Sequence, residues 1–202
     1  MNAATVREQR ADAQRDRILS AAQKCFADRG FHGAGMALIA ETAGMSPGLI
    51  YRYFSSKSDI IQGIVRRQLQ AFAQQLLRPD GLRKDLATTL HDGFYGSQGN
   101  DEDGLEMQAA LVLEISAEAG RDDGIAEVLR DFDLLLDKAA RQWIQNNRAP
   151  RTPALSDKAL AARSLMLRCF IDGLKVRQAR EPGLDPQLLH DALDEFLDCL
   201  RR

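Results

Sequence analysis

Residues 36–57 read MALIAETAGMSPGLIYRYFSSK and decide the fold. This stretch predicts two short helices, one from Met36 to Ala43 and one from Pro47 to about Tyr53 or Phe54. Gly44 ends the first helix, Ser46 can cap the second with its side chain, and Pro47 suits a first helical position because it has no N–H to leave unpaired. Two helices joined by a short turn that contains glycine form a helix-turn-helix. The apolar residues that such a unit buries are present as Ile39, Ala40, Met45, Ile50 and Phe54.

The helices predicted on either side of this unit make the chain all-α. Apolar residues at helical spacing from Ile18 to Phe26 predict a helix that ends at Gly30, and a long helix is expected from Lys57 to about Leu77. No stretch combines period-two alternation with β-branched residues, so no strand is expected. The other helices are predicted at Leu82 to about Phe94, Leu105 to Ala119, Ile125 to Asn146, Ser156 or Asp157 to about Ala179, and from Asp185-Pro186 onward. An N-terminal three-helix domain with the helix-turn-helix is therefore expected to precede a C-terminal bundle of longer helices.

Length and composition fit a globular chain. With 202 residues, of which 45% are hydrophobic, the chain can form one large domain or two small ones. No apolar run approaches the roughly 18 residues of a membrane helix, and residues 1–17 lack the apolar centre of a secretion signal, so a cytoplasmic protein without membrane contact is expected. We expect a flexible tail over residues 1–14, the helix-turn-helix domain over 15–60 and the bundle over 61–202.

Charge is distributed unevenly between these parts. Residues 1–67 carry 10 Lys and Arg against 6 Asp and Glu, whereas the rest of the chain carries 17 against 23. Because residues 1–67 are basic, nucleic acid is a possible partner even though the whole chain has a net charge of −2. A difference in charge of this size between two segments also arises by chance.

The helix that begins at Pro47 carries side chains suited to a phosphate-lined groove. Ile50 and Phe54 share its buried face, so that Gly48, Leu49, Arg52 and Tyr53 fall on other faces, and Tyr51 can turn its hydroxyl outward. An arginine can bridge guanine or bind a phosphate, and a tyrosine can donate to phosphate oxygens.

The chain also resembles a known family. The matching residues are Ile18-Leu19 through Phe26, Gly30-Phe31, Ile39-Ala40, residues 43–54 and Ser56-Lys57. Over about residues 15–65 they resemble the TetR family of bacterial repressors in type and spacing, and the remaining chain resembles that family's ligand-binding and dimerisation domain in outline. One departure is that the family carries Ser or Thr near Ala34 and Gly35, where it caps a helix and touches phosphate.

This resemblance implies a function for the front domain. Residues 47–53 would lie in the major groove of a pseudo-palindromic, double-stranded operator, with Tyr51, Tyr53 and Lys57 on phosphates. The chain would act as a homodimeric regulator, most often a repressor that a small molecule releases from DNA. The expected DNA-binding residues are Pro47, Gly48, Leu49, Tyr51, Arg52, Tyr53 and Lys57.

The back domain offers candidates for the small molecule and for the dimer. Apolar side chains that could line a pocket for a largely apolar effector could equally be plain core, and Glu114 could face a polar ligand group or form a salt bridge. The candidate ligand residues are Met107, Leu111, Glu114, Trp143 and Phe170. The helices over about 156–179 and 186–200 are expected to pair with those of a second copy through Leu165, Cys169, Ile171, Leu174, Leu193, Phe196 and Leu200.

Two other classes of function remain as alternatives, a helical-bundle enzyme and an adaptor that binds only protein. No nucleophile–base pair, paired carboxylates or glycine-rich phosphate loop appears, so no catalytic residue is expected. His32, His91 and His190 lack metal-ligand spacing, so neither a metal nor a cofactor is expected. Arg7 and Arg10 could form an arm in the minor groove or belong to a tail without a role.

Overall fold

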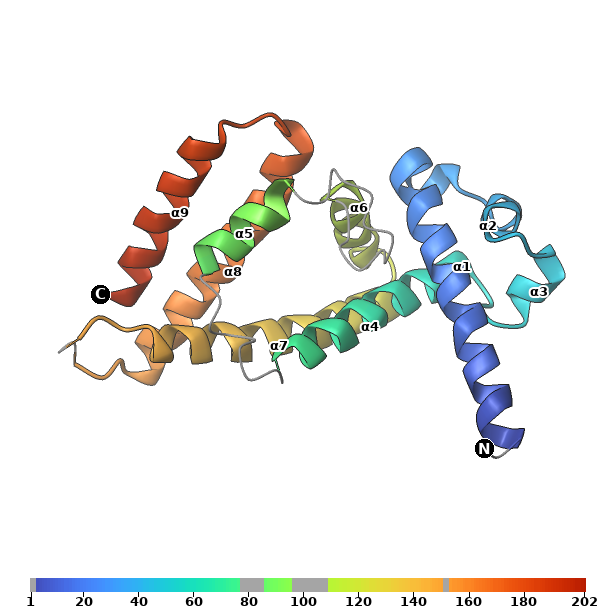
Figure 1. Cartoon of the computed structure of the whole chain (residues 1–202), viewed down its shortest axis with the longest axis horizontal. Coiled ribbons are helices and arrows are strands. Elements are labelled where there is room, and N and C mark those ends of the chain that lie inside the picture. The colour runs from blue at the N-terminus through green and yellow to red at the C-terminus, as the bar shows by residue number, and fades with distance from the viewer. Residues whose placement is uncertain (1–2, 77–85, 96–108, 151–152) are drawn as a thin grey trace. The chain divides into compact units, whose positions relative to one another are not determined.

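The computed structural model describes residues 3–76, 86–95, 109–150 and 153–202, and within these ranges the chain is helical without a strand (Figure 1). This confirms the predicted all-α class. The helices are α1 (Ala3–Gly33), α2 (Met36–Ala43), α3 (Pro47–Tyr51), α4 (Lys57–Leu76), α5 (Leu86–Tyr95), α6 (Ala109–Ala119), α7 (Asp123–Asn146), α8 (Asp157–Arg180) and α9 (Pro186–Arg201).

The structure differs from the prediction at the N-terminus. Residues 3–14, expected to be a flexible tail, form the first turns of α1. Residues 7–17 contain neither glycine nor proline and are rich in Arg, Gln and Ala, which favour a helix without needing an apolar stripe. The first residues of two predicted helices, at 82–85 and 105–108, lie outside the described residues.

The chain divides into two units. The first comprises residues 1–67 and 110–128, and the second comprises 68–109 and 129–202. The first unit therefore includes α6 and the start of α7 in addition to the helix-turn-helix, whereas the sequence suggested a single boundary near residue 60. Side chains buried in this unit include Ile18, Ala22, Phe26, Ile39, Ile50, Ile60, Ile64, Leu111, Ile115 and Ile125.

A glycine kink shapes the end of α1. Gly30 has φ 70° and ψ 166°, a backbone conformation that only glycine adopts readily, and helical turns resume from Phe31 to Gly33. The sequence predicts that this helix ends at Gly30, whereas in the structure α1 is kinked at Gly30 and ends at Gly33.

The second unit is a helical bundle with a core of its own. Trp143 and Ile144 of α7, Leu160 and Leu167 of α8, and Leu189, Leu193, Leu197 and Leu200 of α9 are buried in it. Gln178 donates to the carbonyl of Phe94 over 2.6 Å, and the Tyr95 hydroxyl donates to the carbonyl of Leu184 over 2.6 Å, which ties α5 to the α8–α9 hairpin. No helix within the described ranges is long and apolar enough to cross a membrane.

Candidate nucleic-acid interface

The turn between α2 and α3 is built on Gly44. Its φ of 61° is left-handed, and the N–H groups of Gly44 and Met45 donate to the carbonyls of Glu41 and Ala40, each over 2.9 Å. Paired bonds of this kind end a helix sharply and satisfy its last carbonyls. A Cβ at Gly44 would lie 2.7 Å from Nη2 of Arg17, so the Arg17 side chain would have to move, and the left-handed φ disfavours any residue with a Cβ.

Helix α3 is held by one apolar face. Ile50 is fully buried and Phe54 nearly so, and together they fix the helix on the first unit. Ser46 precedes α3 in an extended conformation, but its side chain makes no capping bond, contrary to expectation. Its carbonyl instead accepts from the N–H groups of Leu49 and Ile50 at 3.0 and 3.3 Å.

The opposite side of α3 is open. Pro47, Gly48 and Arg52 are exposed, Leu49 and Tyr53 are partly exposed, and the Tyr51 side chain is 55% exposed. A large aromatic that stays this exposed next to a fully buried isoleucine is available to a partner. Helix α3 contains no acidic residue, so nothing on it repels a phosphate.

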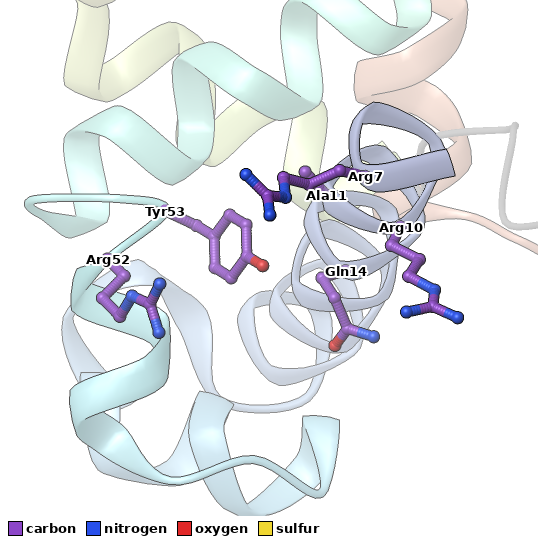
Figure 2. A pocket seen from close by; sticks show the side chains of 6 residues that line it. All are labelled: Arg7, Arg10, Ala11, Gln14, Arg52 and Tyr53. Carbon is purple, nitrogen blue, oxygen red and sulfur yellow. The ribbon is translucent and has the colours of Figure 1, made fainter. Parts of the chain in front are cut away.

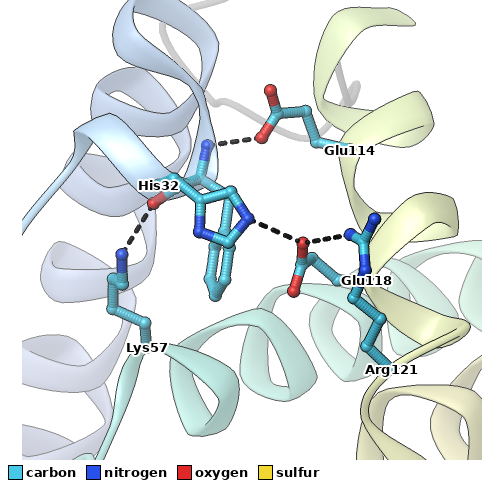
Figure 3. A network of polar contacts seen from close by, with 6 residues as sticks. His32, Lys57, Glu114, Glu118 and Arg121 are labelled. Carbon is cyan, nitrogen blue, oxygen red and sulfur yellow. Dashed lines mark hydrogen bonds and ion pairs between the residues drawn. The ribbon is translucent and has the colours of Figure 1, made fainter.

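Lys57 lies at the start of α4 and is engaged within the chain. Its Nζ donates to the carbonyl of Phe31 over 2.8 Å and lies 4.5 Å from the centre of that ring (Figure 3). The lysine is only partly buried, so the ammonium still has donors for a phosphate, and that contact stays a prediction. The bond to Phe31 spans 26 residues of sequence and could not be predicted from local spacing.

Two glutamates of α6 complete this network. The Glu114 carboxylate accepts a hydrogen bond from the N–H of Phe31, and Glu118 lies 3.2 Å from both His32 and Arg121 (Figure 3). The sequence leaves Glu114 open as a contact for a ligand, whereas in the structure it binds the backbone of α1.

The other candidate ligand residues do not all lie in one of the two units. Leu111 is buried in the first unit, while in the second Trp143 is buried and Phe170 is stacked on Phe196 with ring centres 4.0 Å apart; Met107 lies outside the described residues.

The sequence of the chain is similar to a known protein family and to known transcriptional regulators. Residues 18–64 match the model of the bacterial regulatory proteins of the tetR family. The chain is 28% identical over 143 residues to the HTH-type transcriptional regulator UidR of Escherichia coli, a match that covers 67% of each chain. It is 27% identical over 188 residues to the HTH-type transcriptional repressor AcnR of Corynebacterium efficiens, a match that covers 93% of each chain.

A solved structure extends the likeness to both units. Salmonella enterica GusR has 26% sequence identity and a TM-score of 0.65, with 93% of this chain and 96% of that chain covered. The helix-turn-helix over α2 and α3, the exposed face of α3 and these matches point to one assignment. The chain belongs to the TetR family of bacterial regulatory proteins and is a DNA-binding transcriptional regulator.

Proposed function

We propose that the protein is a homodimeric repressor that binds a pseudo-palindromic operator through α3 and leaves it when a small molecule binds the bundle. The observation that carries the proposal is the exposed surface of α3, where Tyr51 and, directly after the helix, Arg52 are exposed while Ile50 is buried. A rigid helix with an exposed arginine and aromatic residues fits the major groove, where arginine reads guanine or phosphate and tyrosine donates to phosphate. The match to a repressor over almost the full length of both chains supports repression.

The proposed dimer uses the exposed apolar residues of α8 and α9. Leu165 and Met166 of α8 are 53% and 52% exposed, and Leu188 of α9 is 58% exposed. Ala162 and Cys169 continue the row on α8 at spacings of three or four residues. On α9, Ala192 lies four residues after Leu188 and Cys199 lies seven residues after Ala192, which keeps them on one helix face. Exposed apolar patches of this kind mark interfaces. Leu193 and Leu200, which the sequence suggested for this interface, are instead buried within the unit.

The proposed release is a shift between two arrangements of the dimer. Two recognition helices bind DNA together when their spacing matches successive major grooves, about 34 Å apart. A ligand that prefers an arrangement with another spacing lowers DNA affinity without touching DNA. Helix α6 is suited to take part, because Glu114 and Glu118 bond it to Phe31 and His32 of α1 within the first unit.

The experiment is a gel shift with the DNA upstream of the protein's own gene. We expect one retarded complex with the parental protein and strongly weakened binding by a Tyr53→Ala variant. Since operator DNA lies in the cytoplasm, that is the proposed place of action. The two alternatives, an enzyme and a protein-only adaptor, predict no retardation of any DNA, and that result would contradict the proposal.

A further inference from the structure

We propose that the first turns of α1 form a second phosphate-binding surface, in which Arg7 and Arg10 act with Arg52 and Tyr53 to hold the backbone of duplex DNA beside the groove that α3 enters. The proposal rests on the DNA binding proposed above and deepens it. It assigns a partner to residues that the sequence left either as an arm or as a tail without a role.

The residues form a recess on the first unit. Arg7, Arg10, Ala11 and Gln14 of α1 line it from one side, and Arg52 and Tyr53, directly after α3, line it from the other (Figure 2). The recess has a volume of about 640 Å³. Figure 2 shows the Tyr53 ring between the guanidinium groups of Arg7 and Arg52, while Arg10 points outward from the helix. Three arginines and a tyrosine are among the residues that line this space, and none of the described lining residues carries a carboxylate.

The charges of α1 are sorted by face. Arg7, Arg10 and Gln14 are spaced three and four residues apart, and four residues later the same face continues into the buried Ile18. The acidic residues of these turns, Glu8, Asp12 and Asp16, fall on the other side of the helix. Asp12 lies 3.7 Å from Arg15 and Asp16 lies 4.0 Å from Arg67, so two of the three are paired away from the recess.

The arginines of the recess are available for a ligand. Neither Arg7 nor Arg10 has an acidic residue three or four positions away, which is the spacing of ion pairs along a helix. Within the part of the chain that the structure describes, Arg7, Arg10 and Arg52 pair with no carboxylate. Guanidinium groups without a carboxylate partner favour phosphate, whose oxygens they bind through paired N–H donors.

Several features favour DNA over a free anion. The extension from Ala3 to Arg17 adds roughly 22 Å of helix at 1.5 Å per residue, and its residues 7–17 bury none of their side chains fully. It therefore adds little to the apolar core, but it extends the basic surface away from α3. Tyr53 and Arg52 belong both to this recess and to the face expected on the groove, so one continuous surface joins the two sites. Backbone contacts of this kind fix the register of a protein on DNA and carry no sequence information.

The test compares two double variants that remove the same amount of charge. Arg7→Gln with Arg10→Gln removes the recess arginines, and Arg15→Gln with Arg66→Gln removes two exposed arginines that do not line it. Binding to operator and to a random duplex of equal length is measured by fluorescence anisotropy over a series of salt concentrations. Circular dichroism checks that both variants keep the parental helix content, which is expected because all four side chains are exposed.

We expect the recess variant to weaken binding to both duplexes by tenfold or more at low salt. Its slope of log affinity against log salt should fall by about 0.9 for each phosphate that the protein no longer neutralises, which is about two units for each bound protomer. The control variant should keep the parental slope within about half a unit, and Arg7→Lys with Arg10→Lys should restore the slope because counterion release depends on charge.

Three results separate the ways in which the inference can fail. Equal slopes for the two double variants, with a parental protein that binds operator, would overturn this inference and leave the proposed function intact. A parental protein that binds no DNA would contradict the proposed function itself. In the third arm, inorganic phosphate is added and the Nε resonances of the arginines are monitored. Shifts of the recess arginines, together with DNA slopes that the recess variant leaves unchanged, would indicate a site for a free anion and would overturn the assignment to DNA.

Discussion

The Glu114 carboxylate accepts a hydrogen bond from the main-chain N–H of Phe31, a residue 83 positions earlier in the chain. The carbonyl of the same Phe31 accepts from Lys57, so one residue at the kink of α1 joins α6 to the start of α4. The kink at Gly30 interrupts the helical hydrogen bonds and leaves the Phe31 N–H to an outside partner. This hydrogen bond joins α6 to α1 within the first unit, which also contains the helix-turn-helix.

Replacing Gly30 by alanine should destabilise the protein. The φ of 70° costs a residue with a Cβ roughly 1–2 kcal/mol, and this Cβ would lie 2.8 Å from an oxygen of Glu114, which must then move. Urea denaturation should show a lower free energy of unfolding by at least that amount. The control is Gly48→Ala in α3, where a Cβ meets nothing within 4 Å, and which should be neutral or stabilising. Equal stability of Gly30→Ala and the parental protein would contradict this account of the kink.

Lys57→Ala should weaken DNA binding and also lower stability. The side chain donates to Phe31 and covers its ring, and it stands at a helix start where its charge opposes the helix dipole unless an anion is near. Removing one cation from a phosphate should reduce the salt slope of binding by about one unit for all DNA sequences alike. Lys158→Ala, at an exposed lysine of α8, is the control. A drop in stability with an unchanged salt slope would assign Lys57 a structural role only.

Substitution on α8 should dissociate the dimer. Leu165→Glu places a charge in the exposed apolar row of α8, and a buried unpaired charge strongly disfavours association. Sedimentation at micromolar concentration should show a folded monomer for this variant and a dimer for the parental protein. Leu134→Glu on α7 is a matched control, because Leu134 is 70% exposed and lies outside the rows on α8 and α9. Dissociation by both variants, or by neither, would place the interface elsewhere.

The sequence is most informative where structure depends on near neighbours. Gly44, Pro47 and Ser156 lie at helix ends that turn and capping residues predict, and the helix bounds there agree with the structure. The partners of Lys57 and Glu114 lie 26 and 83 residues away, so no local pattern could identify them.

The N-terminal extension does carry a signal in the sequence. Arg7, Arg10 and Gln14 share one helical face and the acids share the other, but the segment lacks the apolar stripe from which a helix is usually predicted. The separation of basic and acidic residues onto opposite faces of a helix would predict this helix. The recess itself also needs Arg52 and Tyr53, and only the packing of α1 against the helix-turn-helix brings these close.

Stability should fall in acid partly through Asp137. The Ser164 hydroxyl donates to its carboxylate over 2.6 Å and Arg141 lies 2.6 Å away; together they hold the pKa of Asp137 below its ordinary value of 3.8. A carboxyl group with a lowered folded pKa adds stability above its unfolded pKa, and that contribution disappears as the pH falls below about 3.8 through the folded pKa.

Ser164→Ala tests this contribution by urea denaturation between pH 7 and pH 3. The variant should be less stable at pH 7, and its stability should fall less than that of the parental protein on going to pH 3. Ser116→Ala is the control, since that exposed hydroxyl bonds only to a carbonyl of its own helix. Parallel acid profiles for Ser164→Ala and the parental protein would contradict the role given to this bond.

Binding of an apolar effector should be visible at Trp143, which is the chain's single tryptophan and is buried in the bundle core. Its ring also lies 5.4 Å from the guanidinium of Arg201, so small movements of α9 against α7 should change its emission. A neutral apolar probe such as decanol should shift the fluorescence in a saturable way, and a Trp143→Phe variant supplies the background.

If the bundle is coupled to DNA binding, the probe should weaken operator affinity by 5- to 150-fold, the range of about 1–3 kcal/mol typical of allosteric coupling. Linkage requires that operator DNA weaken probe binding by the same factor, which gives an independent measurement of one quantity. Saturable binding that leaves operator affinity unchanged would preserve a binding site in the bundle and contradict the switch.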